Sequence, residues 1–196
     1  MKNRVISIGL LIVAISLAGY LVYGIKSSID EKERIARVER KVIEKLMTIR
    51  KAEIGFQAKY GDYTADWDSL ANFIKADSFF ITEKSETIIT LAYGADSVIV
   101  NIDTLGTVSV MDSLFSTPEF SKYDFLALKF IPENKNKAEF EIFAGQIEKS
   151  GVKIHVIEVR DTEPADPTRS EENDGRNRKP LRFGSRTDVT TSGNWE

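Results

Sequence analysis

The first segment of the chain is a long apolar run. Residues 5–25 read VISIGLLIVAISLAGYLVYGI and contain no charged side chain. About 20 consecutive apolar residues let a helix cross the hydrocarbon core of a bilayer. Glycines are tolerated there because such a helix satisfies its own backbone hydrogen bonds. The pattern therefore predicts a membrane-spanning helix, and we assign residues 1–27 to a membrane anchor.

A cleaved secretory signal peptide is the alternative interpretation of this segment. Ser16, Leu17 and Ala18 form a small-x-small pattern that is compatible with cleavage after Ala18. The apolar run continues to Ile25, well past that position, which favours an uncleaved anchor. We expect a single-pass protein of the inner membrane with its C-terminal domain in the periplasm. Basic residues after the span are interleaved with acidic ones, so the positive-inside rule defines the orientation only in part.

Residues 28–60 carry apolar side chains every three or four positions, which predicts a long amphipathic helix. The apolar stripe consists of Ile35, Val38, Val42, Leu46, Ile49, Ala52, Phe56 and Tyr60. We expect its second half to pack on the chain's own domain. No other segment offers an obvious cover for the first half. Ile35, Val38 and Val42 are therefore predicted to contact a partner protein or a second copy, as in a coiled coil.

A second, shorter helix is predicted after the long one. Gly61 is suited to the C-terminal cap of the long helix, and Asp66 to the N-terminal cap of the short one. The apolar face of the short helix comprises Trp67, Leu70, Ala71 and Ile74. Asp62, Asp66 and Asp68 are also candidate calcium ligands, but they lack the spacing and the closing glutamate of an EF-hand loop. Turn and capping roles are favoured, and no metal site is predicted.

After residue 80 the period shortens toward two, which predicts antiparallel strands. The expected strands cover residues 98–102, 108–110, 126–131, 140–144 and 152–159. The expected turns cover residues 103–106, 132–137 and 150–151. The predicted fold class is therefore α+β: a transmembrane helix continuing into a long amphipathic helix, then a short helix, a small antiparallel sheet and a disordered C-terminal tail. Residues 61–160 form the small domain, packed on the end of the long helix.

The C-terminal region divides into two parts of different composition. Residues 161–180, DTEPADPTRSEENDGRNRKP, have almost no apolar side chains and are predicted to be a disordered linker. Residues 181–196 contain Leu181, Phe183, Val189 and Trp195, which suggests a docking segment that binds a partner. If it docks, we expect an extended segment paired with a sheet edge of this domain or of a partner. A frayed tail is the alternative.

The composition limits the available chemistry. The chain has 196 residues, a formal net charge of −3, no cysteine and one histidine. Disulfides, thiolate metal sites and acylated lipoprotein anchors are excluded, and no global attraction to nucleic acid is expected. His155 is predicted to point outward from a strand, and Glu139 and Glu141, the candidate carboxylates for an enzyme, to be solvated. We therefore predict no catalytic residues, no cofactor and no small-molecule substrate.

The segment Ala-Lys-Tyr-Gly-Asp-Tyr, at residues 58–63, ends a helix that continues from a membrane span. This arrangement, over residues 5 to about 75, resembles type IV pilins and pseudopilins. Those families carry a Gly-Phe cleavage site before the span and a glutamate early in it, and residues 1–10 have neither. With GDYTADWDSL, IDTLGTVSVMDSLF, GQIEKSGVKI and GNWE, the whole chain also resembles a family of uncharacterised single-pass bacterial envelope proteins.

The function predicted from these features is a membrane-anchored envelope protein that acts as a non-enzymatic structural or protein-interaction component. The alternative is a pilin-like or pseudopilin-like subunit of a filament or secretion apparatus. The expected partners are the membrane and other envelope proteins, or a second copy bound through the helix.

Overall fold

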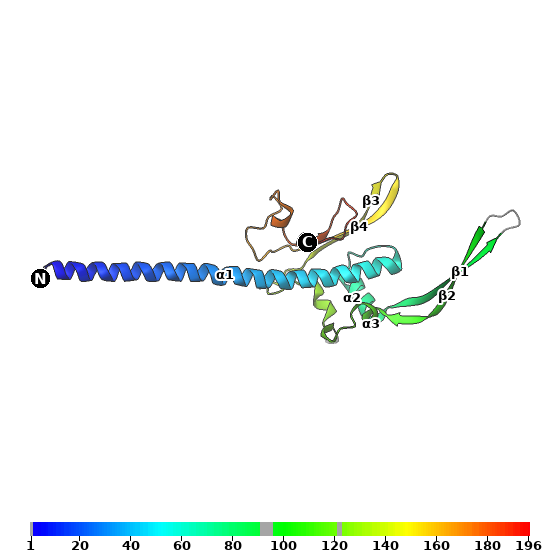
Figure 1. Ribbon diagram of the computed structural model, residues 1–196, viewed down its shortest axis with the longest axis horizontal. Coiled ribbons are helices and arrows are strands. Elements are labelled where there is room, and N and C mark those ends of the chain that lie inside the picture. The colour runs from blue at the N-terminus through cyan, green and yellow to red at the C-terminus, as the bar shows by residue number, and fades with distance from the viewer. Residues whose placement is uncertain (1, 91–95, 121–122) are drawn as a thin grey trace.

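A computed structural model describes residues 2–90, 96–120 and 123–196, and it has an α+β fold (Figure 1). The α-helices are α1 (Lys2–Tyr60), α2 (Trp67–Ala76) and α3 (Val110–Leu114). The 3-10 helices are η1 (Pro118–Phe120), η2 (Phe125–Lys129) and η3 (Arg176–Arg178). The strands are β1 (Ser78–Thr90), β2 (Asp96–Ser109), β3 (Glu141–Lys149), β4 (Val152–Arg160) and β5 (Arg182–Gly184).

Helix α1 is continuous, so the apolar N-terminal segment and the amphipathic segment form one helix. It ends at Gly61 as predicted, because a φ of 87° there terminates the helix at little cost to a glycine. The Gly61 amide donates to the Gln57 carbonyl at 2.8 Å. In Figure 1 the N-terminal half of α1 extends alone, and the C-terminal half runs through the folded domain.

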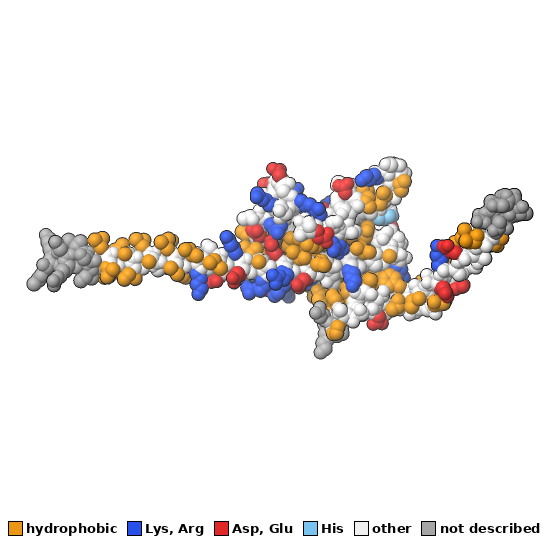
Figure 2. Space-filling view, in the orientation of Figure 1, with side chains coloured by type: hydrophobic (Ala, Val, Ile, Leu, Met, Phe, Trp, Pro, Cys, Tyr) orange, Lys and Arg blue, Asp and Glu red, His pale blue; other side chains and the backbone are white. Residues whose placement is uncertain are grey.

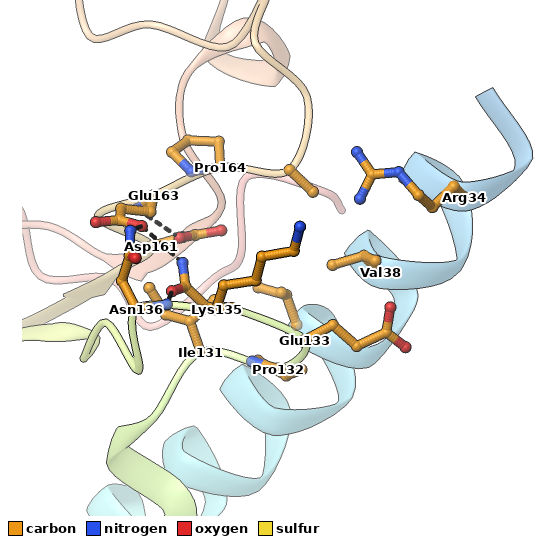
Figure 3. A pocket seen from close by; sticks show the side chains of 13 residues that line it. Arg34, Val38, Ile131, Pro132, Glu133, Lys135, Asn136, Asp161, Glu163 and Pro164 are labelled. Carbon is orange, nitrogen blue, oxygen red and sulfur yellow. Dashed lines mark hydrogen bonds between the residues drawn. The ribbon is translucent and has the colours of Figure 1, made fainter. Parts of the chain in front are cut away.

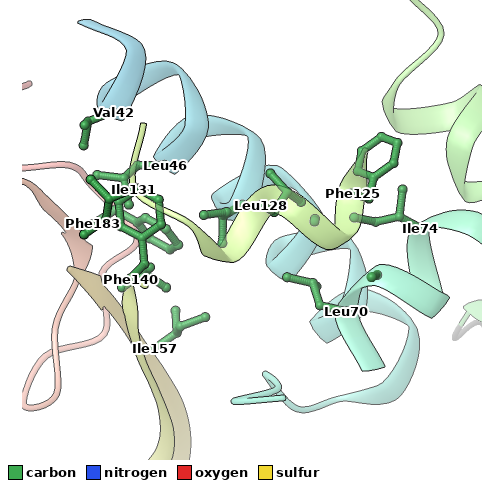
Figure 4. Close-up of a cluster of buried hydrophobic side chains, with 14 of the residues drawn as sticks. Val42, Leu46, Leu70, Ile74, Phe125, Leu128, Ile131, Phe140, Ile157 and Phe183 are labelled. Carbon is green, nitrogen blue, oxygen red and sulfur yellow. The ribbon is translucent and has the colours of Figure 1, made fainter. Parts of the chain in front are cut away.

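The C-terminal half of α1 is the centre of the hydrophobic core. Val38, Val42, Leu46, Ile49 and Ala52 are all buried. In Figure 1 the three-stranded sheet and the C-terminal segment lie on one side of α1, and α2 and α3 lie on the other. Figure 4 shows the side chains that meet there. Those from the rest of the chain include Leu70, Ile74, Phe125, Leu128, Phe140, Ile157 and Phe183.

The chain therefore covers more of the apolar stripe than predicted. Val38 and Val42 were expected to need a partner, yet both are buried by the chain itself. The cover comes from segments distant in sequence, the turns at 131–137 and 161–165, which reach back along the helix. The apolar pattern of α1 gives no indication that later segments fold back to cover these residues.

Helix α2 forms as predicted. The Asp66 carboxylate accepts a hydrogen bond from the Ser69 amide at 2.9 Å, which caps the helix. Its buried face consists of Leu70, Ala71, Phe73 and Ile74. Phe73 also makes edge contacts with Phe56 and Phe79, with ring centroids 5.3 and 5.9 Å apart.

The strands form two separate antiparallel sheets in the described residues, whereas one sheet was expected. Strands β1 and β2 make a long two-stranded hairpin, and the second sheet has the order β3-β4-β5. The predicted turn between β3 and β4 is confirmed: Ser150 and Gly151 have φ of 55° and 80°. Positive φ at both positions is typical of a type I′ hairpin turn.

Two of the predicted elements are wrong. The expected turn at 103–106 is a β-bulge inside β2: Ile81 pairs with Gly106 and Thr82 with Thr104, which leaves Leu105 as the extra residue. The expected strand at 126–131 is instead the 3-10 helix η2. The Asp124 carboxylate accepts from the Leu126 amide at 3.1 Å, and this local bond favours a turn over a strand.

Residues 161–180 also differ from the expected disordered linker, since they form a series of hydrogen-bonded turns. Arg169 donates to the carbonyls of Asn177 and Lys179, at 2.7 and 3.0 Å, and to Glu39 on α1 at 2.5 Å. Side-chain hydrogen bonds thus provide the order that apolar burial would otherwise supply. A low apolar content predicts disorder only when such bonds are absent.

Gly184 gives a test of how the last strand is attached. Its φ is 79°, and a Cβ atom there would lie 2.0 Å from the Ile157 carbonyl oxygen. We expect Gly184→Ala to lower the free energy of unfolding by roughly 3 kcal/mol or more, because β5 must move away from β4. Urea unfolding of the detergent-solubilised chain, followed by tryptophan fluorescence, measures the change.

Gly151→Ala is the matched control. Gly151 has a φ of 80° but no atom within 4 Å of the added Cβ. Its cost should be only about 1 kcal/mol, the strain of a positive φ. Equal losses for the two variants would contradict the docked position of β5.

Candidate functional site

The structure separates the seven predicted partner-binding residues into three groups. Val38, Val42, Leu181 and Phe183 lie in the chain's own core. Ile35 and Trp195 are half-buried. Only Val189 is well exposed, at 52 %. The first four therefore stabilise the domain and are not accessible to a partner in this conformation.

The C-terminal segment docks on its own domain, by the edge pairing predicted for it. Strand β5 pairs antiparallel with β4, and Phe183 lies opposite Val159. The pairing strand is short and ends at Gly184, before the threonine-rich residues 187–191. The alternative of a frayed tail does not describe this segment, because Phe183 is fully buried.

Sequence analysis missed the importance of Asn194. This buried side chain donates to the Pro180 carbonyl at 2.8 Å and accepts from the Arg182 amide at 3.1 Å. Its own amide donates to the Arg182 carbonyl at 3.0 Å. Asn194 lies between a glycine and a tryptophan near the chain end, outside any periodic apolar pattern, so the sequence gave no indication that it would be buried.

Alternating charges form a closed ring around the docked tail, which we call the ion-pair ring. Its members, in order, are Glu141, Arg160, Glu171, Arg182, Glu158 and Arg186. Arg186 lies 2.7 Å from Glu141 and 2.8 Å from Glu158, and it contributes most to holding the pKa of Glu141 below its usual range. The ring links strands β3, β4 and β5 to the turn at Glu171. Each of its carboxylates is paired with arginines and so helps to hold these segments together.

A pocket of about 580 Å³ lies beside α1 at the end of the domain nearest the protruding half of that helix. Arg34, Val38 and Val42 of α1 line one wall. The opposite wall is formed by residues 131–136 and by Asp161 with residues 163–165 (Figure 3). The volume falls in the range of small-molecule sites.

Most polar groups of this pocket have partners, either in its own walls or on neighbouring turns of α1. Asn134 donates to Glu163 at 2.7 Å, and the Glu163 amide donates to Asp161 at 3.0 Å (Figure 3). Glu133 pairs with Lys41 at 2.5 Å. Burial raises the pKa of Asp161 to about 6. The lining carries both signs of charge, with Arg34 and Lys135 beside Glu133, Asp161 and Glu163, so the pocket offers no single electrostatic preference for a ligand.

The most unusual polar residue is Glu53, on the buried face of α1. It is fully buried, and its Oε2 atom accepts from the Thr64 amide at 3.1 Å. Its Oε1 atom has no hydrogen-bond partner within the described part of the chain. Burial raises the pKa of Glu53 to about 8, so the side chain is protonated at neutral pH. Its position between Ala52 and Ile54 in the sequence gave no sign of this burial.

The candidate acid–base residues of the sequence all have local partners. His155 was predicted to point outward from its strand, but it is half-buried. Its Nδ1 atom lies 2.9 Å from the carboxylate of Asp62, which follows the end of α1. Its Nε2 atom lies 3.2 Å from the Gln146 amide nitrogen. Glu139 pairs with Lys129 at 3.0 Å.

The aspartates near α2 do not converge. Asp66 caps α2, Asp62 faces His155, and Asp68 lies exposed in the first turn of α2. In the parts of the chain described, no three or more acidic, histidine or cysteine side chains are arranged to hold a metal ion.

Comparison with protein-family models, with curated proteins and with solved structures gives no match. The interpretation of the molecule therefore depends on its own geometry.

Phe183 tests how strongly the tail is held. Because its ring is fully buried, Phe183→Ala should lower the free energy of unfolding by about 3–5 kcal/mol. Val189→Ala, on the exposed part of the same tail, should change it by less than about 0.5 kcal/mol. Urea unfolding compares the two variants. Similar small effects would mean that the tail is not docked.

Glu53 predicts a pH dependence with a defined sign. Its pKa is about 8 in the folded chain and near 4.5 when unfolded, so the folded state binds the extra proton between these values. The contribution of this group to the free energy of unfolding is complete below pH 4.5. It falls by roughly 1 kcal/mol per pH unit as the pH rises from 4.5 to 8, and it is lost above that range. Urea unfolding between pH 6.5 and 8 avoids the titration of Asp161.

Glu53→Gln is the control for this dependence. The amide cannot ionise, so the variant should lose the decline between pH 6.5 and 8 and be more stable than the natural chain at pH 8. An unchanged pH slope in the variant would show that Glu53 is already ionised in the folded chain.

Proposed function

We propose that this chain is a single-pass inner-membrane protein of a bacterial cell envelope, with a non-enzymatic structural or protein-interaction role. The observation that carries the proposal is the exposed apolar half of α1. That helix contains an 18-residue window with a mean hydropathy of 1.8, of which none is buried, and it is long and apolar enough to cross a membrane.

The distribution of apolar side chains along α1 supports a lipid environment for its first half. Large apolar residues from Leu10 to Ile25 are all exposed, at positions on every side of the helix. Figure 2 shows them on the face in view. From Val38 onward, most apolar residues lie on the buried stripe, and Met47, Ile54 and Tyr60 are the large ones that are exposed. An apolar surface on every side of a helix is typical of a segment solvated by lipid tails.

The arrangement of polar groups favours an interaction role over catalysis. Glu141 belongs to the ion-pair ring, and in the pocket beside α1 Glu163 accepts from Asn134 and Glu133 pairs with Lys41. These groups therefore hold segments of the fold together through ion pairs and hydrogen bonds. The periplasmic placement of the domain is part of the proposal. The flanking charges do not fix it, because basic residues stand on both sides of the span.

A pilin-like subunit is the second candidate. One observation favours it: the membrane-directed segment and the core of the domain are parts of one uninterrupted helix. Such a subunit would require N-terminal processing and assembly through the span. The sequence departs from that class at residues 1–10, which have no Gly-Phe site.

Membrane extraction combined with N-terminal mass analysis tests the proposal. We expect the natural chain to stay in the membrane pellet after alkaline carbonate treatment, to dissolve in detergent and to retain residues 1–18. Recovery in the soluble fraction with Gly19 as the first residue would contradict the anchor. A shortened N-terminus with membrane polymers would instead support the pilin-like subunit.

A further inference from the structure

The pocket beside α1 has one positive charge that the fold itself does not use. Arg34 is paired with Glu31 at 2.7 Å. Glu133 is paired with Lys41 at 2.5 Å. Lys135 also lines the pocket, and it makes no ion pair or hydrogen bond within the described residues. Its ammonium group is therefore available to a ligand.

The wall opposite α1 carries negative charge that is also available. Asp161 is only 2 % exposed, and one of its carboxylate oxygens accepts from the Glu163 amide at 3.0 Å. Its other oxygen makes no hydrogen bond in the part of the chain that the structure describes. The Glu163 carboxylate accepts from the neutral amides of Asn134 and Asn136, at 2.7 and 3.5 Å. A buried carboxylate with an unused oxygen at a pocket wall is suited to a charged donor.

These charges lie apart from one another in the pocket. Figure 3 shows Lys135 between Arg34 of α1 and the wall that carries Asp161 and Glu163. Among the described residues, Lys135 forms no ion pair with either carboxylate. A ligand that carries both signs of charge can therefore contact both.

The remaining walls of the pocket are largely apolar. Ligand pockets commonly combine apolar walls with a few polar groups that fix the orientation of the ligand. The volume of about 580 Å³ leaves space for an aliphatic group beside the charged ones. The apolar lining residues are Val38, Val42, Ile131, Pro132, Pro164 and Ala165.

We propose that this pocket binds a small zwitterion with an aliphatic side chain, namely an aliphatic amino acid or a dipeptide of such residues. The ligand ammonium donates to Asp161 and Glu163, and it can serve both because it has three N–H donors. The ligand carboxylate accepts from Lys135. A ligand with a single charge leaves one wall of the pocket without a partner. This binding site goes beyond the interaction role proposed above and does not depend on it.

Calorimetric titration of the full-length chain in detergent with leucine and with the dipeptide leucyl-leucine tests the proposal. N-acetyl-leucine lacks the ammonium and leucine amide lacks the carboxylate, so each analogue tests one wall. Loss of a charged hydrogen bond weakens binding roughly ten- to hundredfold. We expect saturable binding of at least one zwitterion, at least about tenfold tighter than its single-charge analogues. The tighter of the two distinguishes a free amino acid from a dipeptide.

Two results of these titrations overturn the proposal. One is the absence of saturation by either zwitterion up to about 10 mM, near the weak limit of specific binding. The other is equal binding of leucine and its single-charge analogues. Neither result affects the membrane anchor, which carbonate extraction tests separately.

Lys135→Gln and Lys153→Gln form a matched pair of variants. Both lysines are exposed, so the domain should fold unchanged, and Lys153 lies on β4 outside the pocket. Lys135→Gln should weaken the binding of leucine at least about tenfold, because the ligand carboxylate loses its partner. The binding of leucine amide, which has no carboxylate, should not change. Lys153→Gln should alter neither. An unchanged affinity for leucine in Lys135→Gln would overturn the assigned orientation.

Asp161 gives the binding a defined pH dependence. Burial, assisted by the charges of Glu163 and Glu39, raises the pKa of Asp161 to about 6, and Arg169 opposes this shift. The ligand ammonium favours the ionised carboxylate, and neither charge of leucine titrates between pH 5 and 7. The affinity for leucine should therefore fall roughly tenfold from pH 7 to pH 5.

Asp161→Asn is the control for the pH dependence. The asparagine keeps an oxygen that can accept from the Glu163 amide, but it cannot ionise. The variant should bind leucine more weakly at pH 7 than the natural chain and lose the fall between pH 7 and 5. A natural chain whose affinity is the same at both pH values would overturn the contact between Asp161 and the ligand ammonium.

Discussion

Burial of one stripe of α1 is the constraint on which the rest of the domain depends. Leu46 and Ile49 at its centre are fully buried, and they belong to one hydrophobic cluster with residues of the segments on both sides of the helix. Burying a large aliphatic side chain contributes about 1.5–3 kcal/mol, so the stripe supplies much of the drive to fold. Toward its N-terminus the same helix is apolar on all sides, which suits it to a lipid environment.

In a chain anchored as proposed, this arrangement couples the membrane to the domain mechanically. A flexible linker after the span would let the domain rotate freely, whereas an unbroken helix fixes its orientation relative to the bilayer. The pocket beside Arg34 and the turns at 131–137 then lie on the membrane side, and the β1–β2 hairpin lies at the opposite end (Figure 1). The proposed anchor thus places the exposed apolar side chains of that hairpin far from the lipid.

The sequence predicted the elements that depend on local signals. Gly61 and Asp66 marked helix ends through backbone chemistry, and the period of the stripe identified the buried face of α1. The failures involve contacts between distant segments. The cover over Val38, the burial of Glu53 and the role of Asn194 depend on segments that return from far along the chain. Leu105 and Leu126 were misassigned because a bulge and a 3-10 turn imitate the pattern of a turn and a strand.

The central claim is that one continuous helix both spans the membrane and forms the core of the domain. The distance between spin labels at Lys26→Cys and Met47→Cys, measured by pulsed electron resonance in lipid bilayers, tests it most directly. Both positions are exposed, and the rise of a helix places them roughly 32 Å apart. The claim predicts a single narrow distribution near that distance. A broad distribution at shorter distances would show a break between span and domain, and would contradict it.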